Sequence, residues 1–112
     1  MIRRLSILTR RPEFTHQEFV DHWKGIHGPL ALKVPKIRRY VQSCIVDEHF
    51  RADISPQDDE VDGIAEIWYD SLEDLEFSSQ TPEAKALYAD GAIIIGKIRT
   101  FLIEENEVIS NK

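Results

Sequence analysis

The hydrophobic and polar positions of this chain follow two different periods. Residues 2–9, 37–46, 63–69 and 97–105 alternate with the two-residue period of half-buried strands. Apolar residues at helical spacing fill the segments after the first and the third of these strands. This order predicts an α+β, ferredoxin-like β-α-β-β-α-β fold with a four-stranded antiparallel sheet. We expect one domain over residues 1–112, since this length supports a single core.

The first helix carries the clearest local signals. Thr15 and Glu18 have the S/T-x-x-E spacing of a capping box, in which each side chain bonds to the other residue's backbone amide. Beyond the cap, one apolar stripe contains Phe19, Trp23, Ile26 and Leu30. The residue before a proline avoids the α region, so Gly28-Pro29 predicts a break in this helix near His27.

Two histidines flank the apolar stripe. At about 100° per residue, His22 and His27 lie about 140° apart around a regular helix. One regular helix therefore cannot direct both imidazoles at the same point. A break beside Pro29 would let His27 point in a direction that the rest of the helix does not dictate.

The second half of the chain predicts two further helices. Ser71 is expected to cap the first, and Thr81-Pro82 to start the second, with the proline where a missing N–H costs nothing. The stripe of the second helix contains Ala84, Leu87, Tyr88, Gly91 and Ala92. We expect Gly96 to end it. Residues 47–61 are acidic and follow neither period, which predicts a loop of about 15 residues that is long enough to be functional.

Two helices can cover only one face of such a sheet. The strand patterns assign to the uncovered face the large apolar residues Leu8, Tyr40, Ile64, Trp68 and either Phe101 or Leu102. A soluble monomer rarely exposes so much apolar surface. We therefore expect a homodimer whose sheets pack face to face and enclose a cavity that is partly polar and partly aromatic.

The composition, 42% hydrophobic and 30% charged, is that of an ordinary globular protein. No segment approaches the roughly 20 apolar residues of a membrane span, and no apolar run of signal-peptide type follows the basic start MIRRLSIL. We therefore expect a cytoplasmic protein that does not enter a membrane. The lone Cys44 excludes an intrachain disulfide and a cysteine cluster for zinc.

The net charge of −6 is unevenly distributed. Residues 1–51 hold 10 Lys/Arg and 5 Asp/Glu, whereas residues 52–112 hold 4 and 15. The basic residues form no compact run, so we expect no nucleic-acid partner; the two halves instead attract each other within or between subunits. There is no G-x-G-x-x-G, P-loop or G-x-S-x-G motif, and histidines five residues apart do not form an i, i+4 metal pair. We expect neither a metal nor a cofactor.

Nearly the whole chain resembles the EthD family, part of the dimeric α/β-barrel superfamily of ferredoxin-like folds. The resemblance rests on the runs RRPEFTHQEFVDHWKGIHGPLALKVPKIRRYV, DGIAEIWYDSLEDL and FLIEENEVI. Its most specific residues are Phe19, His22, Trp23, His27, Pro29, Tyr40, Asp62, Gly63, Glu66 and Trp68. It implies a homodimer with a pocket between the sheet and the first helix of each subunit. Members are similar to small cofactor-free proteins tied to ether cleavage, methyl-lactone isomerisation, and dehydration or decarboxylation of fungal polyketides, so no single reaction comes with the fold.

Three residues are candidates for catalysis. His27 titrates near neutrality and can move a proton in either direction, or it is a helix-end histidine that bonds the last carbonyls. His22 is either a second catalytic histidine or a structural one at the helix edge. Glu66 is either a general acid/base or half of an ion pair. The possible partners in such a pair are Arg4, Arg38 and Lys97.

Four residues are candidates for binding a substrate. The Tyr40 hydroxyl could hold a ligand oxygen, and Trp23, Trp68 and Leu8 could form an apolar wall; the alternative is that all four are core residues. Asp90 could pair with a base but is expected at the surface, as a carboxylate late in its helix.

The favoured function is a cofactor-independent isomerase or lyase of catabolism or secondary metabolism. Its substrate would be a small hydrophobic or aromatic molecule, such as a lactone or a polyketide-like compound. One alternative is a cofactorless monooxygenase, an oxidoreductase. The other is a non-catalytic accessory protein that binds a small ligand for an oxygenase system.

Overall fold

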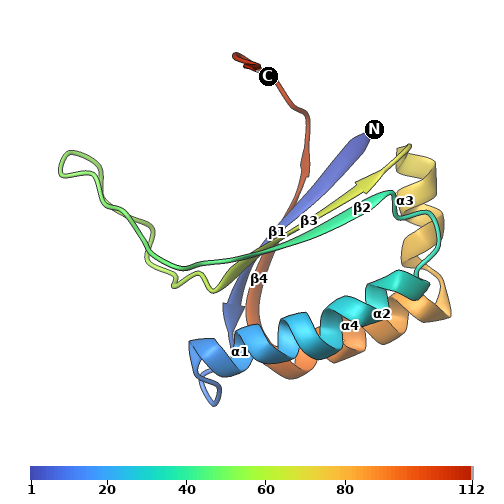
Figure 1. Cartoon of the computed structure of the whole chain (residues 1–112), viewed down its shortest axis with the longest axis horizontal. Coiled ribbons are helices and arrows are strands. Elements are labelled where there is room, and N and C mark those ends of the chain that lie inside the picture. Colours follow the sequence, from blue (N-terminus) through green and yellow to red (C-terminus); the bar gives the residue numbers. More distant parts are fainter. Residues whose placement is uncertain (112) are drawn as a thin grey trace.

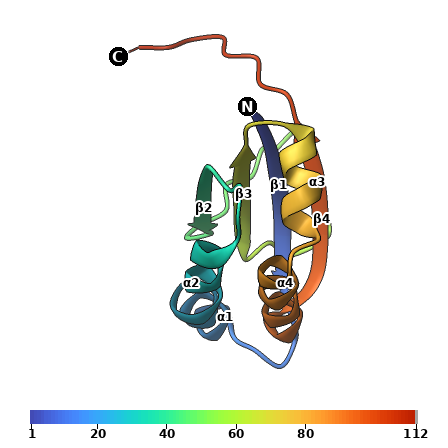
Figure 2. The same ribbon diagram turned by 90° about the vertical axis from the view of Figure 1, so that its right-hand side faces the viewer.

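Four antiparallel strands form one sheet, in the order β2-β3-β1-β4, in a computed structural model that describes residues 1–111. The strands are β1 (Ile2–Arg10), β2 (Arg39–Cys44), β3 (Gly63–Tyr69) and β4 (Ile95–Ile103). All the helices lie against one face of this sheet (Figure 1), and Figure 2 shows the four strands side by side in the stated order. The ferredoxin-like fold is therefore confirmed.

The first helical region is longer and less regular than the sequence predicts. It consists of α1 (His16–His22), a π-helical turn η1 (Trp23–His27), α2 (Gly28–Leu30) and a 3₁₀ turn η2 (Ala31–Lys33). The predicted capping box is present, since Thr15 accepts from the Glu18 amide at 3.1 Å and Glu18 accepts from the Thr15 amide at 2.8 Å.

The predicted break near His27 is wrong. Gly28 is helical, with φ −54° and ψ −48°, so the chain runs through Pro29 without leaving the helix. The restriction on a residue before proline comes partly from a clash with its Cβ, which glycine lacks. The π turn also shifts the hydrogen bonding, because the Gly28 amide bonds to the carbonyl of Trp23, five residues back.

Two more helices complete the helical layer. They are α3 (Leu72–Ser79) and α4 (Pro82–Ile94). Their predicted caps are confirmed: Ser71 accepts from the Asp74 amide, and Thr81 from the Ala84 amide. The predicted end at Gly96 is wrong, since β4 already begins at Ile95. Gly96 lies within the strand, where a Cβ would come 3.0 Å from the carbonyl oxygen of Arg10.

The main core lies between the sheet and the helices. Leu8, Phe19 and Trp23 are at most 2% exposed and pack together. Tyr40 pairs with buried Ile67 across β2 and β3, so it also lies on the helix-covered face. The prediction that Leu8 and Tyr40 lie on the uncovered face is wrong. Alternation along a strand separates two sets of side chains but does not say which set the helices will cover.

The other face of the sheet, which we call the open face, carries no helix. Its residues include Arg3, Leu5, Ile7, Arg39, Val41, Ile64, Glu66, Trp68 and Phe101. The strand register confirms Ile64, Trp68 and Phe101 on this face. Leu102 pairs with Arg4 and points to the other side.

Residues 47–61 form the long loop that the sequence predicts. Apart from a single bridge between Arg51 and Ile54, this loop has no strand or helix, and it extends as an arm away from the body (Figure 1). Its base is held by Asp62, which is completely buried. The Asp62 carboxylate accepts from the backbone and side chain of Arg10 at 2.8 Å and bonds His16 at 2.7 Å.

Candidate active site

A cavity of about 430 Å³ lies between the sheet and the helices. Its walls come from β1, β3, β4, η1 and α4, together with Tyr40 of β2. Four of the predicted site residues line it, namely Leu8, Trp23, His27 and Tyr40. A volume of this size suits a small organic ligand, since such sites span roughly 300–1,000 Å³.

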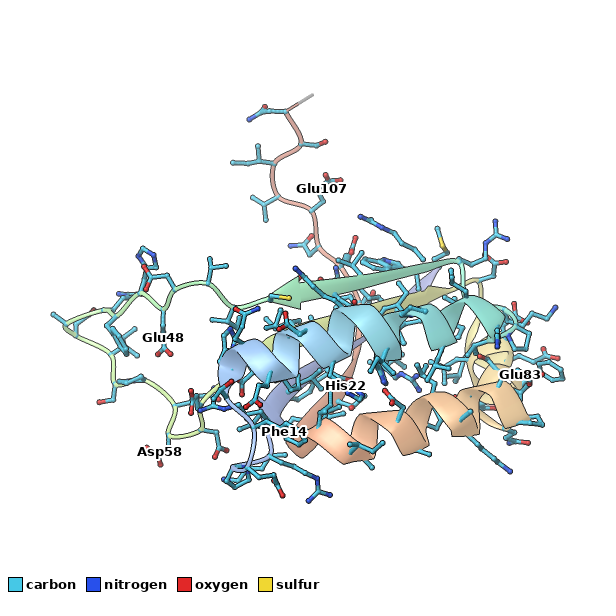
Figure 3. The ribbon with its side chains drawn as sticks, turned by 60° about the horizontal axis from the view of Figure 1, so that its bottom comes forward. Phe14, His22, Glu48, Asp58, Glu83 and Glu107 are labelled. Atoms are coloured by element: carbon cyan, nitrogen blue, oxygen red, sulfur yellow. The ribbon has the colours of Figure 1, made fainter. Side chains whose placement is uncertain are left out.

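The aspartate of α4, Asp90, joins the two histidines of the first helical region. His27 Nδ1 lies 2.9 Å from Asp90 Oδ2, and His22 Nε2 lies 3.0 Å from Asp90 Oδ1. The Asp90 side chain is 11% exposed, so this carboxylate lies between the helices rather than on the surface. Figure 3 shows His22 on the side of the first helix that faces α4.

The π turn explains how both imidazoles reach one carboxylate. In a π turn the hydrogen bond runs from residue i to i+5, so side chains five residues apart come nearly into line. The same turn moves Ile26 outward, where it is 54% exposed, and brings His27 inward, where it is 7% exposed. The sequence predicts Ile26 in the apolar stripe that faces the core, because that prediction assumes a regular helical period through this segment.

A residue of the sheet supports the π turn. Gln42 of β2 donates from Nε2 to the carbonyl oxygen of Trp23 at 2.8 Å, the same oxygen that accepts the Gly28 amide. A Cβ on Gly28 would come 3.0 Å from Gln42 Oε1, so glycine leaves room for this amide side chain. The position of His27 thus depends on packing between the sheet and the helix.

His27 is held in a neutral form that can accept a proton. Burial lowers the pKa of His27 below its ordinary value, the Asp90 carboxylate partly offsets this, and His22 lowers it further. A carboxylate oxygen only accepts, so the ring nitrogens that face Asp90 carry the hydrogens. Nε2 of neutral His27 then has a free lone pair, and it has no hydrogen-bond partner among residues 1–111.

Two neighbours complete the surroundings of His27. Gly91 of α4 gives the ring its space, because a Cβ there would come 3.2 Å from His27 Cε1. Tyr40 lines the same cavity, and burial raises the pKa of its hydroxyl, with Gln42 and Trp23 offsetting only part of this rise. The Tyr40 hydroxyl therefore stays protonated near neutral pH and can donate to a ligand oxygen.

The structure separates Glu66 and Trp68 from this site. Both lie on the open face, on the far side of the sheet from His27. Glu66 pairs with Arg3 at 3.1 Å, and not with any of the three basic residues that the sequence suggested. The Arg3 and Arg39 guanidinium groups lie 5.6 and 4.7 Å from the centre of a Trp68 ring. These residues thus form a polar and aromatic cluster of their own.

Sequence reasoning missed the central position of Asp90. A signal was available, since Asp90 lies three residues after Leu87 and four before Ile94, both of which are buried in the apolar stripe of α4. A carboxylate inside such a stripe faces the core and needs a partner there. Among residues 1–111, no group of three or more His, Cys, Asp and Glu has the arrangement of a metal site, and no helix is long and apolar enough to cross a membrane.

Comparison with known proteins identifies relatives of this chain. The model of the EthD domain matches residues 11–97. A crystal structure of an ethyl tert-butyl ether D (EthD) family protein from Bacillus halodurans has 30% sequence identity and a TM-score of 0.72, over 95% of this chain and 100% of that one. No curated protein matches the chain in sequence.

Two more distant structures share the fold. A dimeric protein of unknown function with a ferredoxin-like fold, from Bacteroides fragilis, has 14% identity and a TM-score of 0.69, over 93% of this chain and 95% of that one. A hydroxynitrile lyase from Passiflora edulis has 16% identity and a TM-score of 0.73, over 97% and 96%. At these identities the likeness concerns the fold alone.

Proposed function

The chain belongs to the EthD family, and we propose that it is a small enzyme that transfers protons on a substrate bound between its sheet and its helices. The reaction would be an isomerisation or a lyase-type elimination that needs no cofactor. One observation carries this proposal: the buried His27 is bonded through Nδ1 to Asp90 at 2.9 Å, and it lines the cavity. This is the arrangement of a general base held in one tautomer by a carboxylate.

The chemistry of this proposal follows from three side chains. Nε2 of His27 takes a proton from a carbon atom next to a carbonyl group of the substrate. The Asp90 carboxylate stabilises the imidazolium that forms, and the Tyr40 hydroxyl donates to the oxygen on which negative charge develops. His27 then returns the proton to another carbon or to a leaving group, which completes an isomerisation or an elimination.

The other residues near the site have supporting roles in this proposal. His22 occupies the second oxygen of Asp90 and so holds the carboxylate in position towards His27. Leu8 and Trp23 form an apolar part of the cavity wall, which keeps water away from a charged intermediate. Glu66 and Trp68 take no part in the reaction, because the sheet separates them from the cavity.

The proposed assembly is a homodimer formed through the open face. The ferredoxin-like relative from Bacteroides fragilis is described as dimeric. The open face supports the same arrangement here, because it carries Ile64, Trp68 and Phe101 without any covering helix. A cytoplasmic location stays a prediction.

Hydrogen exchange at carbon tests the proposed function even before the substrate has been identified. A panel of lactones, β-keto acids and enolisable aromatic ketones is incubated with the protein in D₂O, and deuterium incorporation is followed by NMR. We expect wild type to accelerate exchange in one class, and His27→Ala to reduce that rate by roughly 10²–10⁴-fold. His49→Ala is the matched control, because that side chain is 89% exposed on the long loop.

Three results would contradict the proposal. Equal exchange rates for wild type and His27→Ala would remove His27 from the chemistry. Ligand binding without exchange or turnover would favour the non-catalytic accessory protein. Conversion that stops when oxygen is excluded would favour the cofactorless monooxygenase.

A further inference from the structure

Arg4 of β1 brings a positive charge into the cavity without an acidic partner. It lines the cavity, and among residues 1–111 its guanidinium makes no ion pair. Within the described part of the chain, the only hydrogen bonds of this guanidinium go from Nη2 to the hydroxyl oxygens of Tyr69 and Tyr88, both at 3.4 Å. The adjacent Arg3, on the open face, instead pairs with Glu66 at 3.1 Å and with a second glutamate.

This environment leaves the Arg4 charge without an acidic counter-ion, although the guanidinium also lies over the Tyr69 ring, 5.8 Å from its centre. Bonds of 3.4 Å lie beyond the usual range for N–H···O, so they are weak and can yield to a better acceptor. Tyr69 is buried, and burial raises the pKa of its hydroxyl, so this tyrosine supplies no negative charge near neutral pH. A partly buried cation without a counter-ion is costly, and an anionic ligand would remove that cost.

Arg4 and His27 lie at different places along the cavity. The Arg4 guanidinium bonds Tyr88, whereas the His27 ring contacts the position of Gly91, three residues further along α4. Three helical residues correspond to about 4.5 Å along the axis. The cavity wall is otherwise mostly apolar, and it contains no Asp or Glu, so Arg4 is the sole permanently charged side chain on it among residues 1–111.

We propose that the cavity binds a small organic carboxylate, with the carboxylate paired to Arg4 and Tyr88 and the apolar body directed towards His27. The planar guanidinium has two parallel donors that match the two oxygens of a carboxylate. The carboxylate is then a binding group, and the reacting carbon lies further along the cavity, next to His27. The claim about the reacting carbon rests on the proposed function, whereas the binding of the anion does not.

A pair of probes that differ in charge alone tests this assignment. 1-Naphthoate and 1-naphthamide have nearly the same shape, and either would fit a cavity of this size. Their binding is measured by isothermal titration calorimetry. We expect wild type to bind the acid at least tenfold more tightly than the amide.

Variants of Arg4, Tyr88 and Arg3 test which side chains cause the preference for the acid over the amide. Arg4→Met should bind acid and amide alike, and Arg4→Lys should keep part of the preference, because it keeps the charge but loses the two-donor geometry. Tyr88→Phe alters a helix residue that is 42% exposed, so it should fold normally and should lower the preference several-fold. Arg3→Met is the matched control, since it removes the neighbouring arginine on the opposite face; it should keep the full preference.

Each other outcome overturns the assignment. A wild type that binds neither probe, or binds both alike, has no anion site in this cavity. An Arg4→Met protein that folds normally by circular dichroism and still prefers the acid places the anion elsewhere. His27→Ala should keep the preference for the acid, so loss of exchange in that variant tests the proposed function separately from the anion site.

Discussion

His22 and His27 are five residues apart, and both imidazoles bond the same carboxylate, at 3.0 and 2.9 Å. A regular α-helix would direct them about 140° apart. The π turn between them removes most of this difference, and Asp90 of α4 occupies the point where they converge. π turns are rare in helices, and they occur frequently at functional sites.

Replacing the Asp90 carboxylate, which both histidines bond, should impair His27 as the base. Asp90→Asn keeps the shape, but its amide nitrogen cannot accept, so one of the two histidines must change its tautomer or turn away. We expect the deuterium exchange rate to fall by roughly 10²-fold or more. The rate is measured as for His27→Ala, and ¹⁵N NMR of the imidazole reports the tautomer. Asp21→Asn, on the exposed side of α1, is the matched control; an unchanged rate in Asp90→Asn would contradict the role of the carboxylate.

The lowered pKa of His27 predicts a pH dependence of activity. Burial favours the neutral ring, so the pKa of His27 lies below its ordinary value of 6.5. The exchange rate should rise as the ring loses its proton and should level off once the pH is well above this lowered pKa. NMR titration of the His27 ring should give a midpoint below 6.5. A midpoint at or above that value would show that the carboxylate outweighs burial.

The same shift predicts a pH dependence of stability. The unfolded chain binds the His27 proton more tightly than the folded protein, so the free energy of unfolding rises with pH in this range. The contribution of His27 is fully present above pH 6.5 and is lost as the pH falls through the lower folded pKa. Urea unfolding at a series of pH values measures this slope. His27→Gln should flatten it, and an equal slope in the variant would assign the effect to other groups.

Two glycine-to-alanine substitutions should differ in their effects: one should lower the exchange activity, and the other should raise the free energy of unfolding. In Gly91→Ala the new Cβ would come 3.2 Å from the His27 ring, which must then move away from Asp90. We expect a loss of exchange activity on the order of tenfold, since small displacements of a catalytic group are costly. In Gly25→Ala no atom lies within 4 Å of the new Cβ, so the better helix propensity should stabilise the protein by about 0.5–1 kcal/mol.

The measurement for both variants is the exchange rate together with the free energy of unfolding in urea. Gly25→Ala serves as the control for the change of residue type within a helix. Full activity in Gly91→Ala would show that the ring can shift without losing its function.

The open face should hold the dimer together. Ile64→Glu places a charge at the centre of this face, between the neighbouring residues Ile7 and Ser43, and should convert the dimer to a monomer. Light scattering after size-exclusion chromatography measures the mass. Ile93→Glu is the matched control, because Ile93 is 53% exposed on α4, and it should remain dimeric. A dimer that persists in Ile64→Glu would place the interface on another surface.

The parts of the structure that depend on neighbours in the sequence could be predicted from the sequence. The caps at Thr15, Ser71 and Thr81 each need a side chain and an amide three residues away, so local spacing is sufficient to identify them. The strands follow from the two-residue period, which does not depend on what covers the sheet. The sequence also predicts His27, Tyr40, Trp23 and Leu8 as candidate site residues, and the structure brings these four to one cavity.

The tertiary structure decided which of these elements meet and which face of each is covered. Periodicity could not place Leu8 and Tyr40 beneath the helices, since the two faces of a strand are equivalent until something packs on one of them. The π turn depends on Gln42 reaching the Trp23 carbonyl from the sheet, 19 residues along the chain. The convergence of His22 and His27 on Asp90 brings together residues more than 60 positions apart. Such contacts are set by the packing of the helices on the sheet, and no local pattern encodes them.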